Sequence, residues 1–163
     1  MSPALLSEIR QDLHDLSRAQ RFIVGTSFSS NGQQDNLRSA LTCRPVVPDS
    51  EIGDSDAFWE LHGLLSEARD ELGDLMGRDL AKGFEAVYSI YPPGGYYKRH
   101  VDSLEGVDLE GTGKRSLSFV CYLNEPGWDK SDGGQLVTYG QRDGMEEVSK
   151  VIQPEGGTLA LFD

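Results

Sequence analysis

Residues 91–102 read YPPGGYYKRHVD, and this stretch decides most of what the chain reveals about its fold and chemistry. It ends in a histidine and an aspartate, His100 and Asp102, which are two positions apart. Residues two apart on an extended strand project from the same face, so both side chains are predicted to reach one metal ion. A neutral imidazole and a carboxylate, together with one further histidine, form the facial triad of non-haem Fe(II) oxygenases. Taken alone, the pair is a weak signal, because an exposed histidine near an aspartate is more often a solvated ion pair; with its neighbours it predicts part of a mononuclear iron site.

Further short motifs follow this stretch in a defined order. Arg115 stands at the start of the next predicted strand, residues 121–124 read CYLN, and residues 133–136 read GGQL. With residues 91–102, these motifs resemble the prolyl 4-hydroxylase-like branch of the Fe(II)/2-oxoglutarate dioxygenases, over roughly residues 84–163. The resemblance implies a double-stranded β-helix, a jelly-roll or cupin-like barrel of two facing sheets.

The resemblance also implies roles for individual residues. It makes His100 and Asp102 the metal ligands and the catalytic residues. The residues that it places around the 2-oxoglutarate pocket are Tyr91, Tyr97, Tyr122 and Leu136, with Arg115 at the substrate entrance or bracing the pocket. A phenol in such a pocket can donate a hydrogen bond to a carboxylate without adding a charge. The alternative for the tyrosines is that they fill the barrel core, as aromatic strand residues often do, and this is what we expect of Tyr96.

The reaction implied by the resemblance is the hydroxylation of an unactivated C–H bond. Its cofactors would be Fe(II), O₂ and the small-molecule cosubstrate 2-oxoglutarate, which loses CO₂, and ascorbate would keep the iron reduced. A peptidyl-proline is the leading substrate class. The protein itself would orient the ligands and the substrate and exclude water.

The spacing of apolar residues predicts helices first and strands afterwards. Steps of three and four predict an amphipathic helix over residues 2–19, and a second helix from caps at residues 54–56 to about Gly77. Short strands are predicted over residues 84–91, 96–101, 116–123, 135–139, 147–152 and 158–162. This order indicates a single α+β domain over residues 1–163. Residues 1–83 would form a supporting region of helices and strands, and residues 84–163 the oxygenase barrel core.

The charge and the apolar pattern exclude several classes of partner. The chain has 27 acidic and 15 basic residues and a formal net charge of -12, which disfavours nucleic acids and anionic membrane surfaces. No apolar run approaches the roughly 20 residues of a membrane span, and the first 20 residues lack the apolar centre of a signal peptide, so a cytoplasmic protein is expected. Cys43 and Cys121 are too few for a disulfide framework and are expected to be plain thiols.

A third metal ligand is not evident in this sequence. In the family, the distal histidine and the basic residue that binds the far carboxylate of 2-oxoglutarate follow the strand matched by residues 158–162, and the sequence ends at Asp163. The remaining histidines, His14 and His62, fall in predicted helices, where packing or surface roles are expected. We therefore expect a barrel that lacks its last strand or strands, a truncated record, and little or no activity.

Two other functions remain open on the sequence alone. A catalytically silent double-stranded β-helix could act as a binding or sensing module. A different metallo-barrel, such as a cupin-like protein, would draw several histidines from one strand, and His100 has no such companion.

Overall fold

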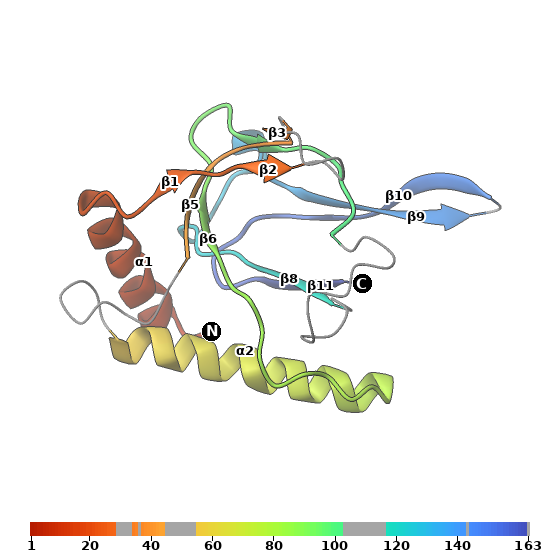
Figure 1. Ribbon diagram of the computed structural model, residues 1–163, viewed down its shortest axis with the longest axis horizontal. Coiled ribbons are helices and arrows are strands. Elements are labelled where there is room, and N and C mark those ends of the chain that lie inside the picture. The colour runs from red at the N-terminus through yellow and green to blue at the C-terminus, as the bar shows by residue number, and fades with distance from the viewer. Residues whose placement is uncertain (29–33, 36, 45–54, 103–116, 143, 163) are drawn as a thin grey trace.

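The structure is a computed structural model that describes residues 1–28, 34–35, 37–44, 55–102, 117–142 and 144–162 (Figure 1). Its helices are α1 Pro3–Arg18, α2 Ser55–Met76 and the short 3-10 helix η1 Lys130–Asp132. Its first strands are β1 Ile23–Val24, β2 Ser27–Phe28, β3 Gln34–Asp35, β4 Arg38–Ser39, β5 Leu41–Cys43 and β6 Tyr88–Ile90. The remaining strands are β7 Tyr96–Tyr97, β8 Ser118–Cys121, β9 Leu136–Arg142, β10 Met145–Ile152 and β11 Leu159–Phe162. The α+β composition predicted from the sequence is confirmed.

The start of α1 is set by a conventional cap. The side chain of Ser2 accepts a hydrogen bond of 3.1 Å from the backbone N–H of Leu5, and Pro3 occupies the first turn, where its missing N–H costs nothing. The helix ends before Gln20, whose φ of 57° is left-handed. Its predicted and observed bounds agree to within one residue.

The core lies where the two helices meet the sheets. Leu5 and Ile9 of α1, each 1% exposed, pack against Ala57 and Leu61 of α2. Leu123, which follows β8, packs against this cluster from the sheet side. In Figure 1, α2 runs beneath β8 and β11. Burying one such leucine or isoleucine contributes about 1.5–3 kcal/mol, so this cluster fixes the helices on the strands.

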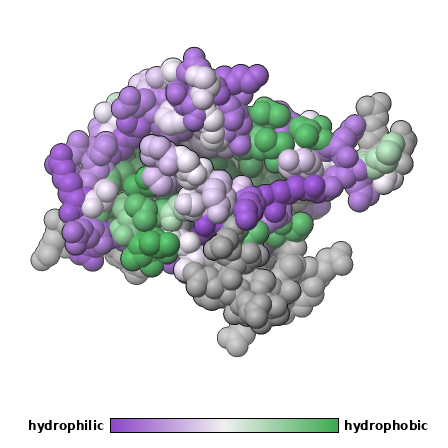
Figure 2. Space-filling view, turned by 90° about the horizontal axis from the view of Figure 1, so that it is seen from above, coloured by the Kyte–Doolittle hydropathy of each residue, from purple (hydrophilic) through white to green (hydrophobic). Residues whose placement is uncertain are grey.

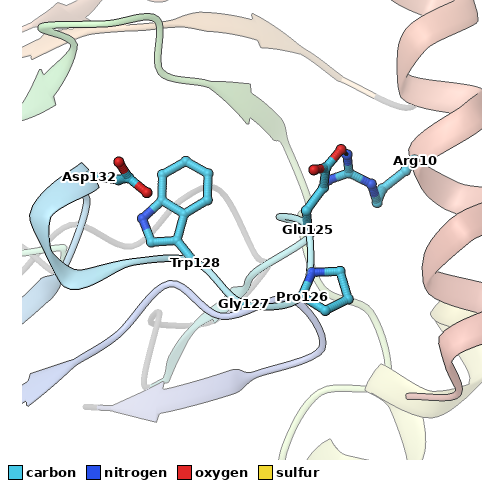
Figure 3. A pocket seen from close by; sticks show the side chains of 6 residues that line it. All are labelled: Arg10, Glu125, Pro126, Gly127, Trp128 and Asp132. Atoms are coloured by element: carbon cyan, nitrogen blue, oxygen red, sulfur yellow. Dashed lines mark hydrogen bonds and ion pairs between the residues drawn. The ribbon is translucent and has the colours of Figure 1, made fainter.

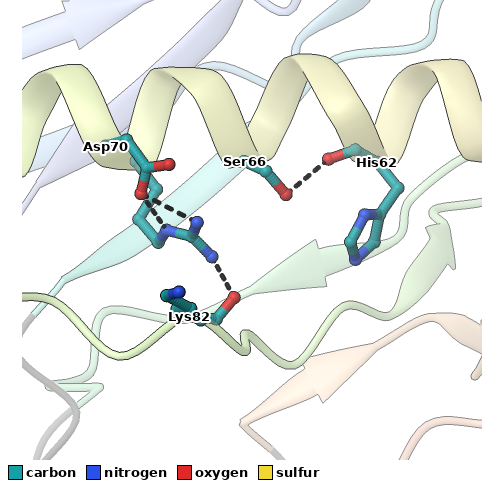
Figure 4. A network of polar contacts seen from close by, with 5 residues as sticks. His62, Ser66, Asp70 and Lys82 are labelled. Atoms are coloured by element: carbon teal, nitrogen blue, oxygen red, sulfur yellow. Dashed lines mark hydrogen bonds and ion pairs between the residues drawn. The ribbon is translucent and has the colours of Figure 1, made fainter.

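Contacts of α2 extend the packing towards the strands. The ring of His62 stacks on Phe84 with 4.8 Å between centroids, and Phe84 meets Phe119 of β8 edge-on at 5.6 Å. The packing role expected for His62 is therefore confirmed. Figure 4 shows the polar contacts nearby, in which Ser66 Oγ donates to the His62 carbonyl oxygen, and a neighbouring arginine binds Asp70 and the Lys82 carbonyl oxygen.

The described strands pair in small antiparallel sheets. One has the order β1-β5-β6, and the others are the pairs β2–β3, β4–β7, β8–β11 and β9–β10. The pair β4–β7 joins the N-terminal region to the stretch that carries the histidine and aspartate, with Arg38 opposite Tyr97. The pair β8–β11 joins Cys121 to Leu159. Strands far apart in the sequence therefore support each part of the candidate site.

On the face seen in Figure 2, the apolar residues form separate areas divided by polar ones. Ile23 and Val24 of β1 are 69% and 71% exposed. None of the described helices is both long enough and apolar enough to cross a membrane. Cys43 and Cys121 are free thiols, as expected, and burial is the main cause that raises the pKa of each.

Candidate metal centre

The segment that carries His100 and Asp102 is not a strand. The predicted strand over residues 96–101 ends at Tyr97, and the backbone bends at Arg99 and again at Asp102. The Lys98 N–H still donates a hydrogen bond of 2.7 Å to the Leu37 carbonyl oxygen, which continues the attachment to the β4 region. Strand alternation was therefore the wrong reason to expect the two side chains on one face, and the bends bring them together instead.

The two side chains meet directly. His100 Nε2 lies 2.8 Å from Asp102 Oδ1, and the side chains are 25% and 30% exposed. The Tyr97 ring stacks on the His100 ring with 3.8 Å between centroids and 17° between planes. The imidazole thus stacks on an aromatic ring with its face and contacts a carboxylate at its edge, and it is partly shielded from solvent.

The hydrogen bond on the other side of the imidazole determines which nitrogen is available. His100 Nδ1 lies 2.8 Å from the Lys98 carbonyl oxygen, which can only accept, so Nδ1 carries a hydrogen and donates it. In the neutral imidazole, Nε2 then presents a lone pair to the lone pairs of Asp102 Oδ1. Two acceptors at this distance repel unless a cation lies between them, either a proton or a metal ion. The arrangement therefore favours a cation at this point.

The same arrangement fits a metal centre. A histidine that binds a metal through one nitrogen usually donates its other N–H to a carbonyl or carboxylate, as His100 does to Lys98. Two atoms in adjacent positions on one ion, each about 2.1 Å from it, lie about 3 Å apart, which is close to the observed separation. Across the described part of the chain, no group of three or more histidine, cysteine or acidic side chains could hold a metal ion. His100 and Asp102 are therefore the two candidate ligands among the described residues.

Tyrosines lie next to this pair. Partial burial is the main cause that raises the pKa of Tyr91, with the nearby Arg38 guanidinium lowering it and Tyr97 raising it further. Burial also raises the pKa of Tyr122, and the second cause is Tyr91. Of these tyrosines, Tyr97 is the one with a described contact to His100, and Tyr91 is linked to Tyr97 and to Tyr122 through these effects on the pKa. The raised pKa values leave Tyr91 and Tyr122 as neutral donors at neutral pH.

The remaining residues that the sequence analysis singled out have no described contact with the His100 and Asp102 pair. Leu136 begins β9, opposite Ile152 of β10, and no described contact joins it to the His100 pair. Arg115 lies outside the described residues. Tyr96, expected in the core, is 42% exposed and lies under the Lys98 ammonium, 5.5 Å from the ring centroid. The core interpretation of Tyr96 was therefore wrong.

Two arginines near the site were not among the predicted site residues. The Arg38 guanidinium carbon lies 5.7 Å from the centroid of the Tyr97 ring, and strand β4 brings it there through non-local pairing. Arg99 stands 4.1 Å from the Tyr139 ring centroid and forms an ion pair with Glu146. Arg99 thus fastens the bent segment to the β9–β10 hairpin. A search for residues alternating with the motif could have found Arg99, but not Arg38.

A cavity of about 350 Å³ lies elsewhere, between α1 and the segment after β8 (Figure 3). In Figure 3, Arg10 reaches from α1 to Glu125, with 2.7 Å between Nη2 and Oε1. Trp128 lines the same cavity and donates its indole N–H to the Gly133 carbonyl oxygen. None of the residues predicted for the metal and cosubstrate sites lines this cavity.

Residues 86–163 match the family described as the 2OG-Fe(II) oxygenase superfamily. Over 104 residues, 63% of this chain, the sequence is 30% identical to the protein named prolyl 3-hydroxylase OGFOD1 of Xenopus laevis. The aligned part is 19% of that relative, so the chain spans about a fifth of its length.

Proposed function

Since residues 86–163 match the 2OG-Fe(II) oxygenase superfamily, we propose that the chain contributes to a dioxygenase that hydroxylates an unactivated C–H bond. The family implies Fe(II), O₂ and the small-molecule cosubstrate 2-oxoglutarate. When bound, these groups supply the oxidising chemistry, and 2-oxoglutarate is converted to succinate and CO₂. The family predicted from the motifs is confirmed, and the reaction of this chain is the proposal.

The observation that carries the proposal is the contact between His100 and Asp102. An imidazole whose Nδ1–H is committed to a carbonyl oxygen and whose Nε2 is directed at a carboxylate supports the proposal that the two side chains bind one metal ion. We propose that these two residues hold the iron, and that a double-stranded β-helix in residues 84–163, supported by residues 1–83 in one domain, carries them.

The chain's own residues would then position the reactants. We assign Tyr91, Tyr97 and Tyr122 to one side of the site, where their phenols would donate hydrogen bonds to carboxylates of the cosubstrate. We assign Leu136 to the apolar wall of that pocket and Arg115 to the substrate entrance. The stacked ring of Tyr97 limits the access of water to His100.

A peptidyl-proline is the substrate class that we propose. Its support is the name of the Xenopus laevis relative, a prolyl 3-hydroxylase, over the aligned 63% of this chain. An acidic chain with a net charge of -12 disfavours a nucleic acid as the substrate. Ascorbate would serve to return oxidised iron to the ferrous state, and we place the protein in the cytoplasm.

The test combines metal binding with turnover. Mn(II), which does not initiate the oxidation, is titrated into the wild-type chain and into His100→Ala, and succinate is measured after Fe(II), 2-oxoglutarate and O₂ are added. We expect His100→Ala to lower Mn(II) affinity at least about 10-fold, because one of two protein ligands is lost, and to abolish any succinate formation.

The matched control is His14→Ala, which removes an exposed histidine from α1. It should leave both measurements unchanged. Equal Mn(II) affinity in the wild-type chain and His100→Ala would contradict the ligand assignment. Binding of Mn(II) and 2-oxoglutarate without any succinate would instead favour the silent binding module, which two protein ligands alone could support.

A further inference from the structure

The cavity beside α1 is lined by charged and aromatic side chains that the proposed reaction does not use (Figure 3). Its volume of about 350 Å³ falls within the range of known ligand sites. The charged lining consists of one cation, Arg10, and two carboxylates, Glu125 and Asp132, and the aromatic lining is Trp128. The cavity therefore combines an excess of negative charge with an indole ring.

The cation in this lining is already paired. Arg10 Nη2 lies 2.7 Å from Glu125 Oε1, and Arg10 Nη1 donates a hydrogen bond of 2.9 Å to the Leu123 carbonyl oxygen. The Arg10 side chain is 24% exposed, whereas the Glu125 side chain is 77% exposed. The guanidinium is thus committed to protein oxygens, while the glutamate faces water. Because a carboxylate has about four acceptor sites, Glu125 can bind a second cation.

The indole and the second carboxylate are both held in place. The Trp128 indole N–H donates a hydrogen bond of 3.0 Å to the Gly133 carbonyl oxygen, which fixes the edge of the ring. Asp132 Oδ2 accepts a hydrogen bond of 3.3 Å from the Asp129 N–H, as part of the capping box of η1. Within the described part of the chain, no ring and no cation stacks on Trp128, which is 38% exposed. The ring face can therefore receive a ligand.

We propose that this cavity binds an arginine side chain of a partner protein. The guanidinium stacks on Trp128, since arginine is the cation found most often over aromatic rings and tryptophan is the best of those rings. Its N–H groups bind the carboxylates of Glu125 and Asp132. The net charge of -12 attracts a basic partner. Free arginine suits the cavity less well, because its own α-carboxylate is repelled by this negative lining.

The experiment compares two peptides that differ in charge but hardly in shape. The chain, labelled with ¹⁵N, is titrated with a blocked pentapeptide of four glycines around a central arginine, and with the same peptide carrying neutral citrulline instead. The NMR shift of the Trp128 indole N–H measures binding, and the indole N–H of Trp59 on α2, which does not line the cavity, is the internal reference. We expect the arginine peptide to bind about 3- to 30-fold more tightly than the citrulline peptide.

Two variants and a control locate the binding. Asp132→Asn keeps the shape of the side chain and removes its charge, so it should bind the arginine peptide about 2- to 5-fold more weakly and the citrulline peptide as the wild-type chain does. Trp128→Leu, followed through the backbone N–H of Gly127, should weaken binding of the arginine peptide by a similar factor. Glu71→Gln removes a carboxylate of α2 that does not line the cavity, and should leave both affinities unchanged.

Three outcomes would overturn the proposal. They are equal affinities for the two peptides, an unchanged preference for arginine in Asp132→Asn, and an equal shift of the Trp59 and Trp128 indoles, which would indicate attraction by the net charge alone. The first two hold even if Trp128→Leu folds poorly. Tighter binding of free arginine than of the arginine peptide would assign the cavity to a small molecule instead of a partner protein. Because the cavity is separate from the predicted metal ligands, His100→Ala should bind the arginine peptide as the wild-type chain does.

Discussion

His100 is fixed on both sides by groups close to it in the sequence. Its Nδ1–H donates a hydrogen bond to the Lys98 carbonyl oxygen, and its Nε2 contacts the carboxylate of Asp102. These contacts span five residues, which is why the YPPGGYYKRHVD stretch was enough to predict the pair. Arg38 could not be predicted in the same way, because only the pairing of β4 with β7 brings it to Tyr97.

The phenol of Tyr91 provides a test at the same scale. Burial raises its pKa, so at neutral pH it remains a donor that can bind a carboxylate. We expect Tyr91→Phe to weaken 2-oxoglutarate binding to the Mn(II)-loaded chain about 2- to 10-fold, the value of one hydrogen bond, measured by calorimetry. Tyr96→Phe removes the hydroxyl of an exposed tyrosine and should have no effect. Equal affinities in the wild-type chain and both variants would remove Tyr91 from the pocket.

Individual helices and strands were predicted with unequal success. The amphipathic spacing located α1 and α2 within about two residues, because a helix face repeats over many residues. The predicted alternation on residues 116–123 is also supported, since Phe119, Cys121 and Leu123 face the helices and their contacts. The strands β1 to β5 are two or three residues long, and β1, β4 and β5 pair with strands further along the chain, so the local sequence gave little sign of them.

The turn between β10 and β11 is closely packed at Gly156. A Cβ at Gly156 would overlap the carbonyl oxygen of Asn124 and would lie 3.0 Å from a methyl carbon of Leu6. The N–H of the adjoining Gly157 donates a hydrogen bond of 2.8 Å to the carbonyl oxygen of Tyr122, so the turn also holds the segment directly after β8. Close backbone packing, not a special φ, requires glycine at position 156.

We therefore expect Gly156→Ala to lower the free energy of unfolding by about 1–3 kcal/mol, because the turn must move away from Asn124. Urea denaturation followed by circular dichroism measures this difference. Gly83→Ala is the matched control, since an added Cβ there meets no described atom within 4 Å, and it should be neutral or stabilising by about 0.5 kcal/mol. Equal stability of the two variants would mean that the turn is not tightly packed.

Over the whole chain, the sequence predicted the fold class better than it predicted which strands pair with one another. Helices followed by strands, and the motifs in residues 84–163, were sufficient for the α+β class and the family. The joining of the N-terminal strands to β6 and β7 was not predictable, because it depends on contacts between residues that lie 45 or more positions apart. Tyr88 is a point where these regions converge, since its phenol is affected by Asp12 of α1, Cys43 of β5 and Cys121 of β8.

The ionisation of the Tyr88 phenol is expected to affect the stability of the whole molecule at alkaline pH. Its pKa is raised from 10.0 to about 12, mainly by burial and next by the charge of Asp12. Above pH 10 the unfolded chain releases this proton while the folded chain keeps it, so the contribution of Tyr88 to stability is full below about 10 and is lost as pH rises to about 12. Urea denaturation from about pH 9 to about pH 12 should show the free energy of unfolding falling less steeply in Tyr88→Phe than in the wild-type chain. Tyr96→Phe, at an exposed tyrosine, should keep the wild-type slope, and an unchanged slope in Tyr88→Phe would show that Tyr88 is not enclosed where α1 meets the sheets.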